Sequence, residues 1–401
     1  MSERKLEDWL SSYLTYTERQ ESPEKLHFWV GLSVLSAALK RQVWMDRGYY
    51  KLYPNTYVLL VAESAMLRKS TAMDIGVKLV RDAVPDIHYI SGSMTPEGLM
   101  KHMNRIKIDK NENGKPHVRY DSHIFIHADE LAELFGFDRQ RASRFTILLT
   151  KIYGAQTEHT HTLATEGQLL LRNLYPTLLA GTDPRNLKVL PEEAVAGLIG
   201  RLVFVTASEK RKAVAWPAPT KEDAARYLLL KEDLTTISQL KGEIIVKEDA
   251  HARFEDWYVK HSEVKEEDSR LDAFRERCHD TALKLAILLS ISTSDSLVLT
   301  DSHMKRGIEY IEKQIPEFSR VANWAISSTY AQNRARFIDT LRRQGGVGMR
   351  RQLLKVLALS LEDVTILEAS LEAEGTIKTR LTGKNVVYTL AKEERGKSDT
   401  P

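Results

Sequence analysis

Short apolar runs alternate with helical stretches through the first half of the chain, and this alternation limits the fold more than any other feature. Residues 57–62 and 122–128 are mostly apolar, which is typical of strands buried on both faces of a parallel sheet. Between them, apolar residues recur at helical spacing from Ser70 to about Pro85. Two more apolar runs follow, at 177–181 and 201–206. The alternation predicts an α/β fold with a parallel sheet at its core.

The chain divides into five predicted regions. An N-terminal helical region covers 1–50, and the α/β core covers 51–215. Residues 216–332 are mostly helical and charged, and they predict a lid-like helical domain. Residues 333–392 give the order helix, glycine-rich turn, helix, helix and two strands, which is typical of a winged helix-turn-helix. Residues 393–401 predict a disordered tail.

The composition limits the compartment and the partners. One cysteine, Cys278, excludes an internal disulfide and a multi-cysteine zinc site, and it fits a reducing cytosol. No apolar run approaches the roughly 18 residues that span a bilayer, and the N-terminal MSERKLEDWL has no signal-peptide core. The net charge of +3 leaves room for local basic patches. The sequence therefore predicts a soluble cytoplasmic protein that does not cross a membrane.

The segment 61–71, VAESAMLRKST, is the most informative stretch for chemistry. It follows a predicted strand and opens a helix, as a phosphate-binding loop does. In such a loop a lysine reaches the β- and γ-phosphates and a hydroxyl binds Mg²⁺. The end of the segment matches this pattern, although Glu63 and Arg68 stand where glycines are usual. We predict that the nucleotide is bound by Glu63, Ser64, Ala65, Met66, Leu67, Arg68, Lys69, Ser70 and Thr71. The alternative interpretation is a solvated helix start.

Two adjacent acids follow the second predicted strand, where a P-loop ATPase keeps its carboxylates. We predict that Asp129 holds Mg²⁺ together with Ser70, and that Glu130 polarises the attacking water. The alternative is structural, because acidic residues also suit the N-terminus of a helix.

Two further residues are candidates for contacts with a nucleotide. Thr182 follows the apolar run at 177–181, where a side chain can contact the γ-phosphate or its water. Arg201 begins the last run and is predicted to act as an arginine finger on the nucleotide of a neighbouring subunit. For Arg201 the alternative is a salt bridge at the rim of the protein.

Six short motifs follow one another along the core: Tyr-Pro-Asn-Thr-Tyr57, Arg-Lys-Ser-Thr71, Thr-Pro-Glu-Gly-Leu99, Ala-Asp-Glu130, Gly-Thr-Asp-Pro184 and Gly-Arg-Leu-Val-Phe204. Their order resembles replication helicase–ATPases encoded by phages and plasmids, long catalogued as a domain of unknown function. The resemblance covers about residues 20–210 and, more weakly, 277–289. It implies a P-loop ATPase core of the AAA+ or RecA-like type, with ATP and Mg²⁺ as ligands. It also implies a homo-oligomeric, hexameric ring that acts on DNA in the replication of a mobile element, with a primase as a further partner.

Similarity to AAA+ proteins also suggests a role for Arg277. It lies seven residues before Lys284 on an apolar helix, so both residues are near one face. By this similarity Arg277 is predicted to be a sensor that contacts the nucleotide from the helical domain. The alternative is an exposed helix charge.

Two predicted hairpins, at about 107–120 and 159–175, are the candidate channel loops of a ring. Basic residues there could contact the phosphates of single-stranded DNA without sequence preference. These residues are Lys107, Lys110, Lys115, Arg119 and Arg172. In the C-terminal module the wing candidates are Lys378, Arg380 and Lys384, whereas acids in the helix at 361–374 argue against base readout. The alternative for both hairpins is a solvated surface turn.

The leading hypothesis is an ATP-dependent DNA helicase or translocase. A first alternative is an AAA+ replication initiator or helicase loader that does not unwind DNA processively. A second is a nucleotide-binding scaffold with a degenerate P-loop, which the missing glycines suggest.

Overall fold

The computed structural model describes residues 4–63, 66–104, 106–110, 116–136, 139–163, 167–189, 197–265, 269–326, 329–357, 359, 361–382 and 385–391. The chain folds into two compact units, Met1–Ala325 and Ile326–Pro401. No helix in these described segments is long and apolar enough to span a bilayer.

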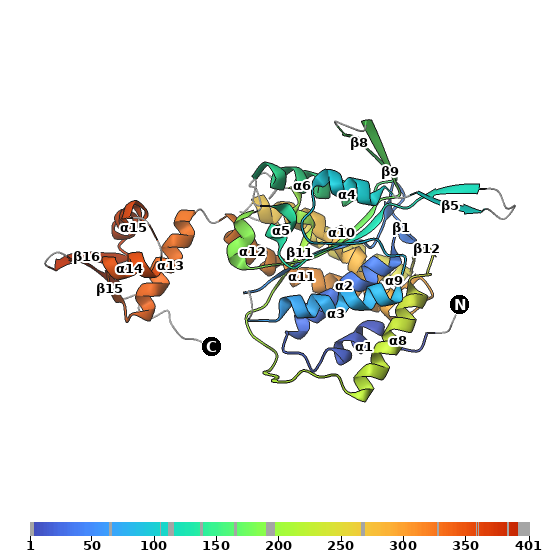
Figure 1. Cartoon of the computed structure of the whole chain (residues 1–401), viewed down its shortest axis with the longest axis horizontal. Coiled ribbons are helices and arrows are strands. Elements are labelled where there is room, and N and C mark those ends of the chain that lie inside the picture. Colours follow the sequence, from blue (N-terminus) through green and yellow to red (C-terminus); the bar gives the residue numbers. More distant parts are fainter. Residues whose placement is uncertain are drawn as a thin grey trace. The chain divides into compact units, whose positions relative to one another are not determined.

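Five parallel strands form the central sheet of the first unit (Figure 1), in the order β11-β3-β10-β7-β4. The strands are β3 (Tyr57–Val61), β4 (Tyr89–Ser91), β7 (His123–Ala128), β10 (Tyr175–Thr182) and β11 (Leu202–Thr206). Every residue of β3, β7, β10 and β11 is buried, which explains why these segments are apolar on both faces. The predicted α/β class with a parallel sheet is confirmed.

Helices cover both faces of this sheet. Figure 1 shows α2 and α3 on one side, and α4, α5 and α6 on the other. The helices of the first unit are α1 (Trp9–Tyr16), α2 (Glu24–Leu39), α3 (Lys69–Ala83), α4 (Pro96–Met103), α5 (Leu131–Phe135), α6 (Arg139–Ile152), α8 (Lys221–Ile237), α9 (Glu248–Glu263), α10 (Ser269–Thr293), α11 (Asp301–Glu312) and α12 (Gln314–Ile326), with short 3-10 helices η1 (Pro184–Val189) and η2 (Ile199–Arg201).

One continuous hydrophobic core runs from Trp9 to Val321. It includes α2, in which every residue after Lys25 is buried, and the apolar stretch of α10. The three regions predicted at 1–50, 51–215 and 216–332 therefore share this core. A small sheet also joins them: β1 (Val43–Asp46) pairs with β2 (Lys51–Leu52) and β12 (Gly242–Glu243). Within 216–332, β13 (Ile245–Val246) pairs with β14 (Val298–Leu299).

Two antiparallel hairpins lie directly before strands of the sheet in the chain. The first is β5 (Ile106–Lys110) with β6 (Pro116–Tyr120), just before β7, and the second is β8 (Glu158–Leu163) with β9 (Gly167–Arg172), just before β10. Both therefore leave the sheet at the amino ends of its strands, and Figure 1 shows them extending from the body. Both predicted hairpins are confirmed as structures.

The second unit combines three helices with a three-stranded antiparallel sheet, ordered β15-β17-β16. Its elements are α13 (Thr329–Arg343), β15 (Val347–Met349), α14 (Arg350–Leu357), α15 (Leu361–Ala373), β16 (Ile377–Thr382) and β17 (Asn385–Leu390). It has its own core around Phe337, Leu353 and Tyr388. The expected element order is observed, and β15 is an additional strand that the sequence did not predict. The predicted tail at 393–401 lies outside the described residues.

Candidate functional site

The turn between β3 and α3 is made without glycine. Arg68, the residue before the helix, has φ of 51°, the left-handed conformation that glycine adopts at low cost. Its Nε donates to Glu21 Oε2 at 2.8 Å. The backbone N–H of Val214 donates to the other carboxylate oxygen of Glu21, at 3.2 Å. Arg68 and this backbone N–H lower the pKa of Glu21 to about 2. The chain thus holds an arginine in a glycine-like turn through a carboxylate from the N-terminal region.

Lys69 opens α3 and points into the protein. Its side chain is 7% exposed, and Nζ has no hydrogen-bond acceptor among the described residues. The nearest carboxylate oxygen recorded for Nζ is Glu130 Oε2, at 4.0 Å. Burial lowers the pKa of Lys69, while Glu130, Asp183 and Asp129 act in the opposite direction. A buried ammonium without hydrogen bonds is costly, so this site would be completed by an anionic ligand.

Glu130 is held in place by the neighbouring strand. Thr182 Oγ1 donates to Glu130 Oε1 at 2.7 Å, and the Asp183 N–H donates to Oε2 at 3.3 Å. Thr182 is fully buried at the end of β10, which lies between β3 and β7. The structure therefore brings together Lys69, Glu130 and Thr182, as their positions at the carboxyl ends of parallel strands suggest. Thr182 contacts Glu130 directly, a contact that the sequence did not predict.

Gly181 makes room for the lysine. A Cβ on Gly181 would lie 2.9 Å from both Cδ and Cε of Lys69 and 2.7 Å from the Asp129 carbonyl oxygen. Sequence reasoning missed this residue. The signal was present, because glycine inside a fully buried strand often marks a close approach by another group.

Arg185 is a second residue at this edge that the sequence analysis missed. Its Nε and one terminal nitrogen donate to the two oxygens of the buried Asp183, at 2.8 and 2.7 Å. The arginine itself is 80% exposed, and its hydrogen bonds to Asp183, together with the charges of Asp183 and Glu63, raise its pKa. Of the predicted loop residues, Met66 is exposed and Leu67 buried, while Ser64 and Ala65 lie outside the described residues.

Asp129 belongs to a group that could bind a metal ion. Its side chain is 54% exposed, and Oδ1 lies 3.5 Å from His127 Nε2. Ligand atoms of Asp74, His127 and Asp129 lie within 4.8 Å of one another. Asp74 is one helical turn after Ser70, so both are on the same face of α3. The exposed carboxylate of Asp129 fits the predicted magnesium role, and Asp74 is an acid that the prediction omitted.

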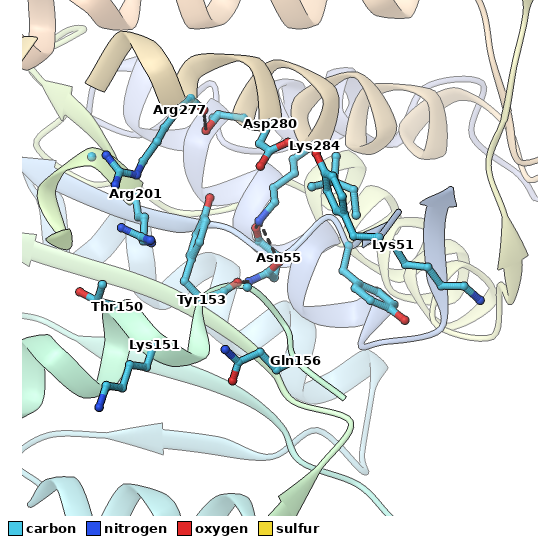
Figure 2. A pocket seen from close by; sticks show the side chains of 16 residues that line it. Lys51, Asn55, Thr150, Lys151, Tyr153, Gln156, Arg201, Arg277, Asp280 and Lys284 are labelled. Atoms are coloured by element: carbon cyan, nitrogen blue, oxygen red, sulfur yellow. Dashed lines mark hydrogen bonds between the residues drawn. The ribbon is translucent and has the colours of Figure 1, made fainter. Parts of the chain in front are cut away.

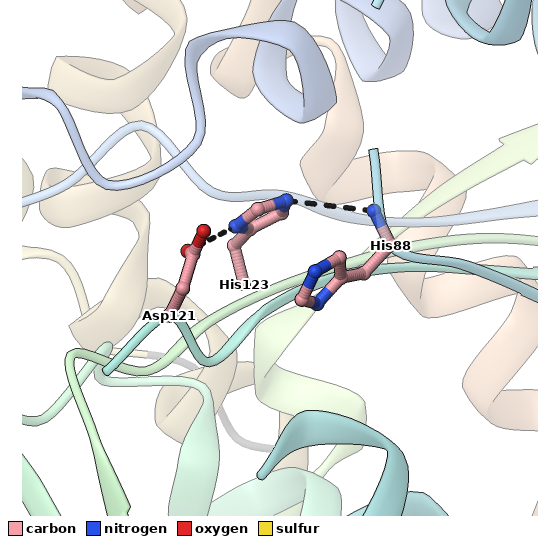
Figure 3. Close-up of side chains that lie close together, drawn as sticks. All are labelled: His88, Asp121 and His123. Carbon is pink, nitrogen blue, oxygen red and sulfur yellow. Dashed lines mark hydrogen bonds and ion pairs between the residues drawn. The ribbon is translucent and has the colours of Figure 1, made fainter. Parts of the chain in front are cut away.

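A second such group, His88, Asp121 and His123, lies at the amino ends of β4 and β7 (Figure 3). His123 Nδ1 is 2.5 Å from Asp121 Oδ1, and the backbone N–H of His88 donates to His123 Nε2 at 3.4 Å. The two imidazole rings stack, with centroids 4.3 Å apart. Because both ring nitrogens of His123 are engaged, this group acts as a hydrogen-bonded brace for the strands.

Arg201 and Arg277 lie at the opposite edge of the sheet. Leu202 pairs with Tyr57 at the start of β3, so Arg201 is a strand length, roughly 15 Å, from the end that leads to Lys69. Arg201 and Arg277 line one cavity of about 300 Å³ (Figure 2). α10 thus places Arg277 at the amino edge and not beside Lys69 of the same chain, and its role as a sensor stays a prediction. The role of Arg201 on a neighbouring subunit stays a prediction.

The predicted DNA contacts are only partly described. Arg172 Nε lies 3.0 Å from Glu158 Oε1, and its guanidinium is 4.8 Å from the Tyr120 ring centre. Arg172 therefore connects the two hairpins where they join the sheet. Lys378 and Arg380 are exposed on β16. Lys107 and Lys110 are on β5 and Arg119 is on β6, but the structure does not describe their side chains. Lys115 and Lys384 lie outside the described residues.

No model of a protein family matches the sequence, and a search of curated proteins found no match.

Proposed function

We propose that the protein is an ATP-dependent DNA helicase or translocase that works as a ring oligomer in the replication of a phage or another mobile element. The observation that carries this proposal is the buried ammonium of Lys69, which has no acceptor among the described residues and faces Glu130 at 4.0 Å. The oxygens of a nucleoside triphosphate would supply the missing acceptors.

The residues at this edge suit a triphosphate that arrives with a metal ion. The first backbone N–H groups of α3 have no partners within the helix, and they would bind phosphate oxygens beside Lys69. The exposed Arg185 would contact the triphosphate at the mouth of the site. Ser70 and Asp129 would hold Mg²⁺, because their side chains supply the oxygen ligands that this ion prefers. When bound, the ion would neutralise charge on the phosphates.

Glu130 is the candidate base for hydrolysis. It would accept a proton from water as the water oxygen bonds to the γ-phosphorus. The bond from that phosphorus to the bridging oxygen would break, and ADP would leave with the electron pair. The hydrogen bonds from Thr182 and from the Asp183 N–H fix the carboxylate for this task. Arg201 of an adjacent subunit would stabilise the charge that develops.

DNA contacts are proposed for the hairpins and for the second unit. The hairpins extend from one edge of the sheet, as loops in a ring channel would. The helix-strand-helix-helix-strand-strand order of the second unit is typical of a winged helix, and it supports our proposal of that fold. Lys378 and Arg380 would then contact the DNA backbone. On α15, Glu368 is bonded to Arg350 and to Tyr388, which favours a structural role for that helix over base readout.

Two observations favour the alternative functions. The arginine in the phosphate-loop turn is tied to Glu21, which favours a nucleotide-binding scaffold without turnover. The separate second unit favours an initiator or loader that binds DNA or another helicase.

The test is DNA-stimulated ATP hydrolysis by the wild type and by Lys69→Ala, with strand displacement measured in parallel. We expect the substitution to abolish turnover and leave the fold intact. A variant that hydrolyses ATP at the wild-type rate would contradict the assignment of Lys69. Binding of ATP without phosphate release would favour the scaffold, and turnover without processive unwinding would favour the loader.

A further inference from the structure

The cavity at the amino edge of the sheet carries an unusual charge. Its lining includes five cationic side chains and a single carboxylate, Asp280. Figure 2 shows Arg201, Arg277 and Lys284 around one hollow, whereas the side chains of Lys51 and Lys151 extend away from it. The five basic side chains come from the segment before β3, from the end of α6, from η2 and from α10. They are Lys51, Lys151, Arg201, Arg277 and Lys284.

Lys284 is a built-in part of this cavity. Its side chain is only 3% exposed, within the otherwise apolar stretch of α10. Nζ donates to the backbone oxygen of Asn55 at 3.1 Å and to its Oδ1 at 2.9 Å, and it lies 3.9 Å from the centre of the Tyr153 ring. Asn55 Nδ2 in turn donates to the Tyr153 carbonyl oxygen at 2.8 Å. These contacts fix a basic side chain in the cavity wall.

Two guanidinium groups share the rest of the wall. In Figure 2 the side chains of Arg201 and Arg277 converge on the same space. Burial and the charge of Arg277 both lower the pKa of Arg201, because neighbouring cations repel. The carboxylate of Asp280 already accepts a hydrogen bond from Tyr50 Oη at 3.1 Å. An anion between the two guanidiniums would relieve their repulsion.

We propose that this cavity binds the phosphate group of a mononucleotide-sized ligand, at a site distinct from the one at Lys69. Arginine binds phosphate in a bidentate manner, and lysine adds a point charge. The volume of about 300 Å³ is at the lower end of the range for small-molecule sites. The aromatic rings of Tyr53 and Tyr153 line the same hollow and offer surfaces for a base or a sugar. The site does not depend on ATP hydrolysis.

The phosphate can come from a free nucleotide or from the 5′ end of a nucleic-acid strand. Both sources present the same monoester chemistry to the arginines. The strand is a candidate because Gln156 of the cavity lies two residues before the start of the β8–β9 hairpin, and this hairpin is a proposed DNA contact.

The experiment uses the full chain with Lys69→Ala, which removes the nucleotide site at the other edge of the sheet. Calorimetric titration with AMP and with inorganic pyrophosphate should show one remaining site. Adding Arg277→Gln should weaken AMP binding about tenfold or more, the loss typical of a charge-assisted contact. Lys305→Ala, an exposed lysine on α11 outside the cavity, is the control and should change nothing.

A second arm separates the two sources. A short single strand with a 5′-phosphate and the same strand with a 5′-hydroxyl are compared on the same proteins. Tighter binding of the phosphorylated strand, lost in Arg277→Gln, assigns the cavity to strand ends. AMP binding without this preference assigns it to a free ligand. The proposal is overturned if neither AMP nor pyrophosphate binds to Lys69→Ala. It is also overturned if adding Arg277→Gln, or a folded Arg201→Gln, leaves the affinity for both compounds equal to that of Lys69→Ala.

Discussion

The two edges of the central sheet each contain a buried lysine, and the two ammonium groups differ in their hydrogen-bond partners. At the carboxyl edge, Lys69 has carboxylates nearby but no hydrogen-bond acceptor within the described chain. At the amino edge, Lys284 has two acceptors from Asn55. Burial there lowers the pKa of Lys284 to about 7. We therefore propose that the first lysine receives a ligand, whereas the second is already hydrogen-bonded within the protein.

The charged side chains around the two lysines also differ between the two edges. Glu130, Asp183 and Asp129 would repel a bare anion from the carboxyl edge, so this edge suits an anion that is accompanied by a metal cation. At the amino edge the cavity is lined by five basic side chains and one carboxylate, so this edge suits an anion alone. The contrast predicts that phosphate binding depends on Mg²⁺ at the first edge only.

The largest effect is expected for Glu130→Gln. This substitution keeps an acceptor for the Thr182 hydroxyl but removes the base, and general-base catalysis typically contributes 10²–10⁴-fold. ATP turnover should fall by about 100-fold or more, while binding of ATP persists. The measurement is phosphate release beside equilibrium binding. Turnover within a few-fold of wild type would remove Glu130 from the mechanism.

Thr182→Val should have a smaller effect on the same edge. It removes the hydroxyl that donates to Glu130 at 2.7 Å and keeps the shape of the buried side chain. We expect kcat to fall about tenfold, the value of roughly one hydrogen bond, with KM almost unchanged. Thr177→Val, a buried threonine earlier in β10, is the matched control and should leave kcat near wild type. Equal kcat values for both variants would show that the Thr182 contact is not used.

Lys284→Met should affect stability and leave turnover at the other edge unchanged. It leaves the two oxygens of Asn55 without their donor, which costs about 1–3 kcal/mol. Urea unfolding and ATP hydrolysis measure the two quantities. A large loss of turnover in a folded variant would show that the two edges are not independent.

The same lysine predicts a pH dependence. The folded pKa of Lys284, about 7, is below its unfolded value of 10.5, so the unfolded chain binds more protons between these values. The contribution of Lys284 to stability is greatest above pH 10.5 and falls as the pH is lowered toward 7. The stability difference between wild type and Lys284→Met should therefore shift in favour of wild type from pH 7 to pH 9. A difference that is constant over this range would contradict the shifted pKa.

The smallest effect is expected at Arg68. Glycine and alanine both remove the contact with Glu21, but only alanine keeps a Cβ in the left-handed turn. Arg68→Gly should therefore be more stable than Arg68→Ala by about 1 kcal/mol. Thermal unfolding of the pair measures this. Alanine as stable as glycine would show that the turn is not strained.

The sequence predicted the features that depend on local pattern. Strands buried on both faces are apolar throughout, so β3, β7, β10 and β11 were recognisable. Lys69 and Glu130 follow two of these strands and Thr182 ends a third, and the three residues meet because parallel strands end at one edge. What the sequence could not reveal depends on contacts between distant segments. Examples are the Glu21 tether of Arg68, the clearance at Gly181 and the position of Arg277 on the far edge.

The most direct test of the account is equilibrium binding of ATP, with and without Mg²⁺, to the wild type and to Lys69→Met. The wild type should bind ATP at the carboxyl edge far more tightly with Mg²⁺ than without it. Lys69→Met should lose this Mg²⁺-dependent binding and unfold at no lower a temperature than wild type, because it removes a buried charge without hydrogen bonds. Undiminished Mg²⁺-dependent binding by Lys69→Met would contradict the central claim that Lys69 receives a triphosphate.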